Sequence, residues 1–165
     1  MNIDFTGEDF EQHWCHIDCK NKVVLDLGAD FGSTAKCFLA KGAKAVIPVE
    51  GDANLYHRLK LSYPNAEMCF VDSTAKMKEL LEKHEADIVK VDIELGEIWL
   101  QTQTDELLRK FKEWMIEGHK WVITELLIER FAKAGFSLIK RFGLNEDINV
   151  FFMVRKDRYG NWTWQ

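Results

Sequence analysis

The chain has 165 residues and a formal charge of −5, the difference between 22 basic and 27 acidic side chains. Its hydrophobic fraction of 47% and charged fraction of 30% are ordinary for a folded domain, which excludes intrinsic disorder, collagen and coiled coil. The length suits one domain, no apolar run approaches the ~18 residues of a membrane span, and the net acidity disfavours non-specific nucleic-acid binding.

The first residues and the cysteines indicate a cellular compartment. Residues 1–12 are acidic and lack the apolar segment of a secretory signal. Four cysteines are too few for a disulfide scaffold in a chain of this length, so we expect reduced thiols. The sequence therefore predicts a cytoplasmic protein without a membrane partner.

Short apolar strands alternate with helical patterns in the first part of the chain. Strands are expected at residues 22–27, 45–50, 67–71 and 87–92. The helices between them are expected to begin at Ser33, after a cap at Asp52, and after a cap at Ser73 or Thr74. Such strand–helix units favour a parallel sheet.

The second part of the chain continues the alternation and ends in a hairpin. A helical stripe is expected from Leu107, Leu108, Phe111, Trp114 and Met115. The apolar run 121–125 predicts a fifth strand, and 127–133 predicts a short helix. Two further strands are expected at 136–142 and 148–154.

Together these elements predict an α/β fold, a doubly wound and mostly parallel seven-stranded sheet with helices on both faces. Ligands of such sheets bind beyond the carboxyl ends of the strands, near the switch point of the strand order. We divide the chain into an N-terminal helical segment at 1–21, a main domain at 22–156 and an aromatic tail at 157–165.

The loop after the first strand contains two glycines, Gly28 and Gly32, which let the backbone turn tightly and approach a ligand closely. Asp30 stands where a dinucleotide-binding loop has its second glycine, so a pyrophosphate would meet a carboxylate there. The loop therefore favours a ligand without phosphates. A plain glycine turn is the alternative interpretation.

Acidic residues follow the next two strands. Glu50 ends the second strand, where a carboxylate can accept hydrogen bonds from both hydroxyls of a ribose. Asp72 follows the third strand and can accept a hydrogen bond from an adenine amine, with Val71 against the ring. Taken singly, Glu50 could be a solvated acid and Asp72 a helix cap. Their joint occurrence beside the glycine loop indicates a shared site.

Two sequence motifs match a known family. The first loop reads Asp26-Leu27-Gly28-Ala29-Asp30-Phe31-Gly32, and the fourth strand reads Lys90-Val91-Asp92-Ile93-Glu94-Leu95-Gly96-Glu97. The first motif, followed by Glu50 and Asp72, resembles the class I S-adenosylmethionine-dependent methyltransferase fold. The second is similar to the K-I-D-I-E-G-x-E signature of the FkbM-like methyltransferases. The resemblance covers roughly residues 22–156 and implies the strand order 3-2-1-4-5-7-6, with strand seven antiparallel.

The resemblance implies S-adenosyl-L-methionine as cofactor and places the main domain around it. Gly28 and Gly32 would border its methionine part, Asp26 would hold its amino end, Glu50 would take the ribose hydroxyls and Asp72 would lie by the adenine. The whole implied cofactor set is Asp26, Gly28, Ala29, Gly32, Glu50, Gly51, Asp72, Ser73 and Asp92. The implied catalytic residues, facing the methyl group and the acceptor, are Asp92 and Glu94.

The sequence allows more than one role for several residues near this site. Glu125, at the end of the expected fifth strand, is a weaker candidate base, whereas His119 precedes that strand and is expected at the opposite end of the sheet. Trp99 either lines the acceptor site or packs in the core.

Two residues of the fourth-strand motif need separate comment. Leu95 departs from the family, which usually has glycine at this position. Lys90, in a buried strand, either pairs with an acid of the site, Asp92 or Glu94, or extends to a sheet end.

The expected function is methyl transfer from S-adenosyl-L-methionine to an oxygen of a small-molecule acceptor. The alternatives are an RNA or nucleotide methyltransferase, which the basic and aromatic tail would support, and a non-catalytic protein that binds a nucleoside cofactor. The sequence allows an oligomer. No metal ligands are assigned, and metal binding is left open for a cluster of zinc-ligand residue types formed by His13, Cys15, His16 and Cys19.

Overall fold

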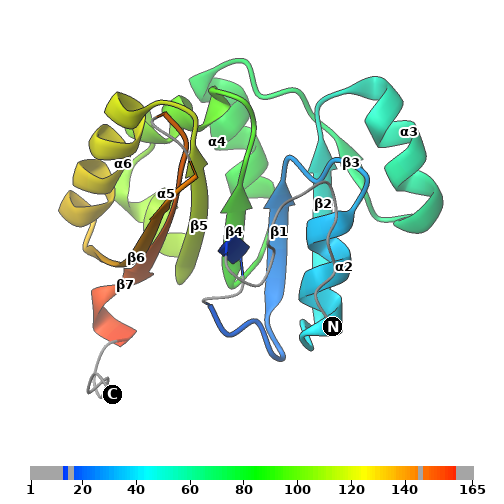
Figure 1. The fold of residues 1–165 in the computed structure, drawn as a ribbon, viewed down its shortest axis with the longest axis horizontal. Helices are drawn as coiled ribbons and strands as arrows, with labels where there is room; N and C mark the ends of the chain where they lie inside the picture. Colours follow the sequence, from blue (N-terminus) through cyan, green and yellow to red (C-terminus); the bar gives the residue numbers. More distant parts are fainter. Residues whose placement is uncertain (1–12, 15–16, 145–146, 159–165) are drawn as a thin grey trace.

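The computed structural model describes residues 13–14, 17–144 and 147–158. They form one seven-stranded sheet with the order β3-β2-β1-β4-β5-β7-β6 (Figure 1). The strands are β1 (Val23–Leu27), β2 (Ala45–Glu50), β3 (Glu67–Met68), β4 (Ile88–Val91), β5 (Glu113–Gly118), β6 (Phe136–Gly143) and β7 (Asn149–Arg155). Strand β7 runs antiparallel to both of its neighbours, while the pairs from β3 to β5 are parallel. The expected fold class and strand order are confirmed.

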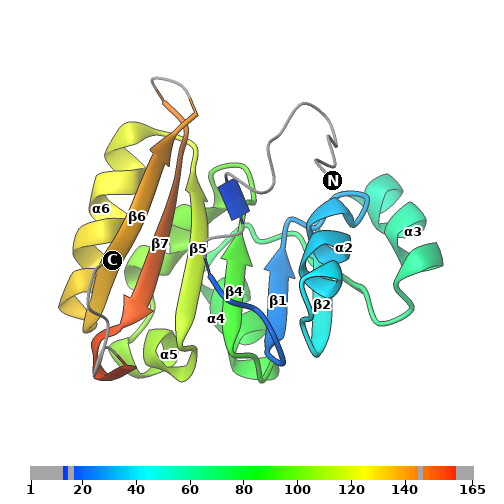
Figure 2. The same cartoon turned by 60° about the horizontal axis from the view of Figure 1, so that its bottom comes forward.

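Helices cover both faces of this sheet (Figures 1 and 2). They are α2 (Ser33–Ala40), α3 (Ala53–Ser62), α4 (Thr74–Lys83), α5 (Asp105–Lys110) and α6 (Trp121–Lys133), with 3-10 helices η1 (Gly96–Thr102) and η2 (Lys156–Arg158). No helix among the described residues has the length and apolarity needed to cross a membrane.

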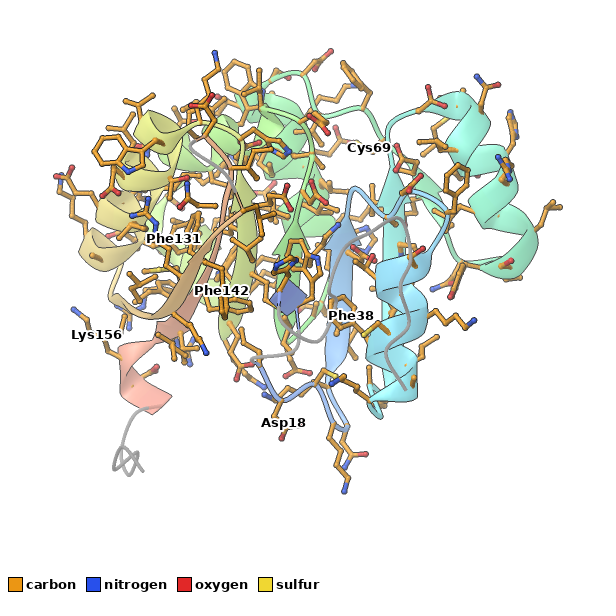
Figure 3. The ribbon with its side chains drawn as sticks, in the orientation of Figure 1. Asp18, Phe38, Cys69, Phe131, Phe142 and Lys156 are labelled. Atoms are coloured by element: carbon orange, nitrogen blue, oxygen red, sulfur yellow. The ribbon has the colours of Figure 1, made fainter. Side chains whose placement is uncertain are left out.

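Alternate residues of the central strands point to opposite faces and build two separate cores. Leu25 and Leu27 of β1 pack with apolar side chains of α4, α5 and α6 on one face. Val24 packs with α2 and with Trp14 on the other face. Figure 3 labels Phe131 of α6 and Phe38 of α2, one large aromatic side chain from each core. Burial on both faces explains why the strands read as continuous apolar runs.

Two of the predicted helix caps are present. The Asp52 carboxylate accepts hydrogen bonds from the backbone N–H groups of Asn54 and Leu55, at 2.8 and 2.9 Å. The Ser73 hydroxyl accepts one from Lys76, at 3.4 Å. Since Ser73 caps α4, the interpretation of Asp72 as a helix cap is wrong, and its side chain is left for another role.

The prediction for the fifth strand is wrong. Trp114 and Met115, expected on a helix, lie in the middle of β5, and the expected strand 121–125 is the start of α6. Strand β5 is buried along most of its length because β4 and β7 flank it and helices cover both faces, so its apolar run lacks the alternation of a half-buried strand. Trp121 and Val122 are 56% exposed on the first turn of α6. Strand β3 also ends earlier than expected, at Met68.

Candidate active site

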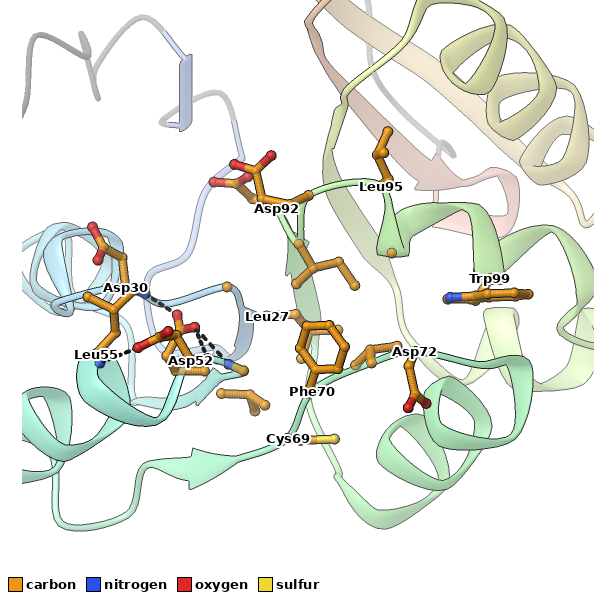
Figure 4. Close-up of a pocket in the computed structure, with 18 of the residues that line it drawn as sticks. Leu27, Asp30, Asp52, Leu55, Cys69, Phe70, Asp72, Asp92, Leu95 and Trp99 are labelled. Atoms are coloured by element: carbon orange, nitrogen blue, oxygen red, sulfur yellow. Dashed lines mark hydrogen bonds between the residues drawn. The ribbon is translucent and has the colours of Figure 1, made fainter.

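A cavity of about 680 Å³ opens at the carboxyl ends of β1, β2 and β4 (Figure 4). This is the point at which the strand order reverses, between β1 and β4. Its volume lies in the range of about 300–1,000 Å³ that is usual for small-molecule sites. The sheet therefore places a ligand-sized hollow where its topology favours one.

Six of the ten predicted site residues line this cavity: Gly28, Glu50, Gly51, Asp72, Asp92 and Glu94. The other four, which are not among its lining residues, are Asp26, Ala29, Gly32 and Ser73. Asp26 is fully buried, Ala29 packs in a small core with Leu59, and Ser73 caps α4. The six lining residues thus lie at or just after the carboxyl ends of the strands, and the other four predicted residues lie behind the cavity wall.

The glycines of the first loop are required by close contacts. A Cβ atom on Gly28 would lie 1.7 Å from the carbonyl oxygen of Asp92, and the backbone there has φ of 77°. A Cβ atom on Gly32 would lie 2.4 Å from the ring of Tyr63, with φ of 90°. Only glycine combines this backbone conformation with the space available. Gly28 therefore brings the ends of β1 and β4 together at the cavity.

The Glu50 carboxylate is held by hydrogen bonds from the backbone around it. One oxygen accepts hydrogen bonds from the N–H groups of Gly51 and Asp52, at 2.7 and 2.8 Å, and the other accepts one from Asp30 at 2.8 Å. A carboxylate offers about four acceptor positions, so these three bonds fix its orientation and leave room for a further donor from the cavity.

A buried lysine joins two of the strand-end acids. Lys90 Nζ lies 3.3 Å from Asp26 Oδ1 and 3.4 Å from Asp92 Oδ2, and it donates to the carbonyl of Gly28 at 2.6 Å. The expected ion pair with an acid of the site is confirmed for Asp92. Burial alone would lower the pKa of Lys90, but Asp92 and Asp26 outweigh it and raise the pKa above its usual range. Its two carboxylate neighbours therefore favour the charged form of Lys90 beneath the cavity.

Asp26 is the least accessible of these acids. Its Oδ2 accepts a hydrogen bond from the Thr34 hydroxyl at 2.6 Å, which ties β1 to α2. Burial raises the pKa of Asp26, against the opposing effects of Lys90 and Thr34. Asp26 is connected to the glycine loop through Lys90, which pairs with Asp26 and donates to the carbonyl of Gly28.

Negative charge dominates the cavity wall. Six acidic side chains line it, Asp30, Glu50, Asp52, Asp72, Asp92 and Glu94, and no lysine, arginine or histidine does so among the described residues. Burial, and then the charge of Glu50, raise the pKa of Asp30. The cavity is therefore suited to a cationic ligand and unsuited to a phosphate.

Sequence reasoning missed the apolar part of the wall. Phe70, Leu55 and Ile98 line the cavity together with the predicted Val71, and Phe70 is 66% exposed. In the view of Figure 4 the ring of Phe70 is drawn between the labelled side chains of Leu27 and Asp72. An aromatic residue two positions before Asp72 was the available signal. Trp99, whose role the sequence left open, also lines the cavity.

The corrected fifth strand reverses the positions expected for His119 and Glu125. His119 follows β5 at its carboxyl end, so it lies on the side of the site and not at the opposite end of the sheet. Its Nε2 lies 3.6 Å from an oxygen of Asp92 and 3.6 Å from one of Glu94. Glu125 lies on α6 and pairs with Arg141, so the interpretation of Glu125 as a base at a strand end is wrong.

His119 is surrounded by carboxylates. Its backbone N–H donates to Glu97 Oε1 at 2.9 Å, and its ring Nδ1 lies 3.3 Å from the same oxygen. Burial would lower the pKa of His119, but Glu97, Asp92 and Glu94 outweigh it and raise the pKa to about 9. The surroundings thus favour a positive charge at this point beside the cavity.

The loop after β4 has an unusual backbone. Glu94 and Leu95 have φ angles of 47° and 73°, in the left-handed region that glycine prefers. Leu95 is the position at which the resembling family has glycine, and the loop nevertheless adopts the glycine-like conformation. This turn carries Glu94 to the cavity wall.

Of the cysteine–histidine cluster, Cys15 and His16 lie outside the described residues. Cys19 is buried and its thiol lies 3.6 Å from the carbonyl oxygen of Phe38, within the core under α2. The ring of His13 lies 6.4 Å from that of Phe142.

The comparisons with solved structures define the fold. The chain is similar to Aeropyrum pernix fibrillarin with natively bound S-adenosyl-L-methionine (TM-score 0.61, 13% identity, 84% of this chain and 69% of that one). It is also similar to magnesium protoporphyrin IX methyltransferase of Synechocystis with bound S-adenosylhomocysteine (0.58, 13%, 84% and 75%). A Streptococcus agalactiae protein of the NADB-Rossmann superfamily gives 0.68 (14%, 99% and 73%). The chain thus has the Rossmann-like fold of class I S-adenosylmethionine-dependent methyltransferases.

The sequence relatives define the family. The chain is 32% identical over 115 residues to "Uncharacterized protein 158B" of Sulfolobus islandicus rod-shaped virus 1, covering 68% of this chain and 70% of that protein. It is 29% identical over 114 residues to "Uncharacterized protein 65" of Sulfolobus islandicus filamentous virus, covering 68% and 69%. The chain belongs to the family of protein 158B. No family model matches the sequence.

Proposed function

We propose that this protein is an S-adenosylmethionine-dependent methyltransferase that acts on an oxygen of a small-molecule acceptor. The observation that carries the proposal is the set of six carboxylates that line one cavity. They lie at the end of β2 and in the loops after β1, β2, β3 and β4, and no lysine, arginine or histidine is among the described lining residues. S-adenosylmethionine has a sulfonium and an ammonium against one carboxylate, so it is a net cation. A dinucleotide, which the Rossmann-like fold also accommodates elsewhere, would bring a pyrophosphate onto Asp30.

The cavity also suits the shape of the cofactor. Its 680 Å³ offers enough space for a nucleoside with an amino-acid arm, and its wall combines apolar and acidic parts. Glu50 has an acceptor position left for a ribose hydroxyl. Asp72 would accept from the adenine amine, and Phe70 would pack on the face of the base. When bound, the cofactor supplies a methyl group on a positively charged sulfur, which is strongly electrophilic.

The residues at the end of β4 would act on the acceptor. Asp92 is held by Lys90, and Glu94 is 88% exposed at the mouth of the cavity. Glu94 or Asp92 would take the hydroxyl proton while the acceptor oxygen replaces sulfur on the methyl carbon and the electron pair of the broken bond stays on sulfur. Holding the two reactants at attack distance supplies roughly 7–11 kcal/mol of the barrier in such reactions.

The family and the acceptor class in this proposal are each supported by a separate observation. The assignment to the FkbM-like methyltransferases depends on the strand-four motif from Lys90 to Glu97. The similar structures include enzymes named for a ribosomal protein, a tRNA and a porphyrin, so the fold is compatible with many acceptors. We favour a small molecule over RNA because phosphates would meet the acidic rim.

Binding of S-adenosylhomocysteine tests the proposal. At 100 times its dissociation constant the ligand should stabilise the protein by about 2.7 kcal/mol, which a thermal-shift assay detects. Phe70→Ala should weaken binding by about 5- to 150-fold, because base stacking on an aromatic ring is worth about 1–3 kcal/mol. Leu61→Ala is the matched control, since Leu61 is 86% exposed on α3 and outside the cavity.

The absence of stabilisation at millimolar ligand would contradict the proposal, as would an equal loss of binding in Phe70→Ala and Leu61→Ala. Transfer of a labelled methyl group from S-adenosylmethionine into a cell extract then separates the acceptor classes. Label in the metabolite fraction supports a small-molecule acceptor, and label in RNA supports the alternative. Binding without any transfer would support a non-catalytic protein.

A further inference from the structure

Beside the cavity, three carboxylates converge on the same ring nitrogen. His119 Nε2 lies 3.6 Å from Asp92 Oδ1, 3.6 Å from Glu94 Oε2 and 3.6 Å from Glu117 Oε1. The side chains of His119 and Glu117 are 9% and 8% exposed. Glu117 and His119 lie at the carboxyl end of β5, and Asp92 directly follows the neighbouring strand β4, so the sheet sets the spacing between these three residues.

The three distances from Nε2 to a carboxylate oxygen are too long for hydrogen bonds and lie at the upper end of the distances between two ligands of one ion. Nε2 forms no hydrogen bond within the part of the chain that the structure describes, although the side chain is nine-tenths buried. Two donor atoms about 2.0–2.2 Å from one cation lie about 3–3.6 Å apart at ordinary coordination angles. One donor atom each of Asp92, Glu117 and His119 lies within 4.8 Å of the others.

The other ring nitrogen of His119, Nδ1, faces the buried carboxylate of Glu97. Glu97 is fully buried, and its Oε1 lies 3.3 Å from His119 Nδ1 while also accepting the His119 backbone N–H. A proton on Nδ1 would point to Glu97 and leave the Nε2 lone pair directed at the three carboxylates. A carboxylate behind the imidazole is the usual support of a metal-binding histidine.

The charge of the cluster favours a cation as well. Asp92, Glu94, Glu97 and Glu117 surround one imidazole, and the nearby cation Lys90 also pairs with Asp26. Even a protonated His119 leaves this group of five side chains with a net negative charge. Carboxylates with a single imidazole suit Mn²⁺ better than the thiol-preferring metals.

We propose that Asp92, Glu117 and His119 bind a divalent cation of the Mn²⁺ class, with Glu97 as the positioning residue behind His119. Glu94, on the exposed loop, would add a fourth donor. The site itself does not depend on the proposed function, but its use does. If the protein transfers methyl groups to oxygen, an ion held by Asp92 would lower the pKa of the acceptor hydroxyl beside the cavity.

Sequence reasoning assigned no metal here because it placed His119 at the opposite end of the sheet. Once β5 ends at Gly118, the residues Glu117 and His119 fall next to the end of β4. The ligands are therefore separated by some 25 residues in the chain, from Asp92 to Glu117, and no short motif contains them all.

Equilibrium titration of the full chain with Mn²⁺, followed by the electron paramagnetic resonance signal of the free ion, tests the site. Wild-type protein should bind one Mn²⁺, and His119→Ala and Glu117→Gln should each weaken binding at least tenfold. Glu97→Gln should weaken it by about 10- to 100-fold through the orientation of His119. His57→Ala, on an exposed position of α3, is the matched control and should bind as wild type does.

The absence of saturable Mn²⁺ binding to the wild-type protein would overturn the proposal. So would unchanged affinity in both His119→Ala and Glu117→Gln, provided that circular dichroism shows both variants folded. S-adenosylhomocysteine binding is measured on the same samples. Binding of Mn²⁺ without the adenosyl ligand would support the metal site and refute the methyltransferase, and the reverse result would do the opposite.

Discussion

At the scale of single residues, Lys90 is the side chain on which most of the site's geometry depends. Lys90→Met would leave Asp26 buried without its cation, and breaking such a pair typically costs about 3–5 kcal/mol. We expect a loss of that size in the free energy of unfolding, measured with urea. Lys44→Met, at an exposed lysine, should change it by less than about 0.5 kcal/mol. Equal free energies of unfolding for the two variants would show that the Lys90–Asp26 ion pair does not stabilise the fold.

The double variant Lys90→Met/Asp26→Asn separates charge from shape. It removes the buried carboxylate charge together with its partner, so it should recover part of the stability lost in Lys90→Met. A double variant less stable than Lys90→Met alone would mean that Asp26 is held mainly by Thr34 and the loop.

At the scale of elements, the junction of β1 with β4 rests on Gly28. Gly28→Ala requires the carbonyl of Asp92 to move, since the new Cβ would lie 1.7 Å from it. Gly42 has a similar φ of 88°, but a Cβ there would meet nothing closer than 3.5 Å. Gly42→Ala should therefore cost only the backbone penalty of about 1–2 kcal/mol, and Gly28→Ala clearly more. Equal losses in urea unfolding would contradict a close β1–β4 contact.

The elements also show which parts of the fold a sequence can predict. The turn at Gly28 and the caps at Asp52 and Ser73 were predictable because each depends on its own neighbours in the chain. Strand β5 was not, because its burial comes from β4, β7 and helices distant in sequence. Trp114 and Met115 fitted a helical stripe equally well, and Trp121 and Val122 resembled a strand although they are exposed on α6.

At the scale of the whole molecule, one consequence of the fold is a concentration of acids at the carboxyl edge of the sheet. The chain carries a formal charge of −5, but six carboxylates gather on one cavity wall. The acids Glu50, Asp72 and Asp92 were predictable from their positions after apolar runs, although Asp72 lies in the loop beyond β3 and not at its end. Glu97, Glu117 and His119 were not, because only the correct position of β5 brings them together.

A structure of the protein with S-adenosylhomocysteine tests the central claim most directly. The account predicts the adenine between Phe70 and Asp72, a ribose hydroxyl on Glu50, and the sulfur at the end of β4 near Asp92. Ligand bound at another face of the sheet, or in the cavity with its adenine and amino-acid ends reversed, would contradict it.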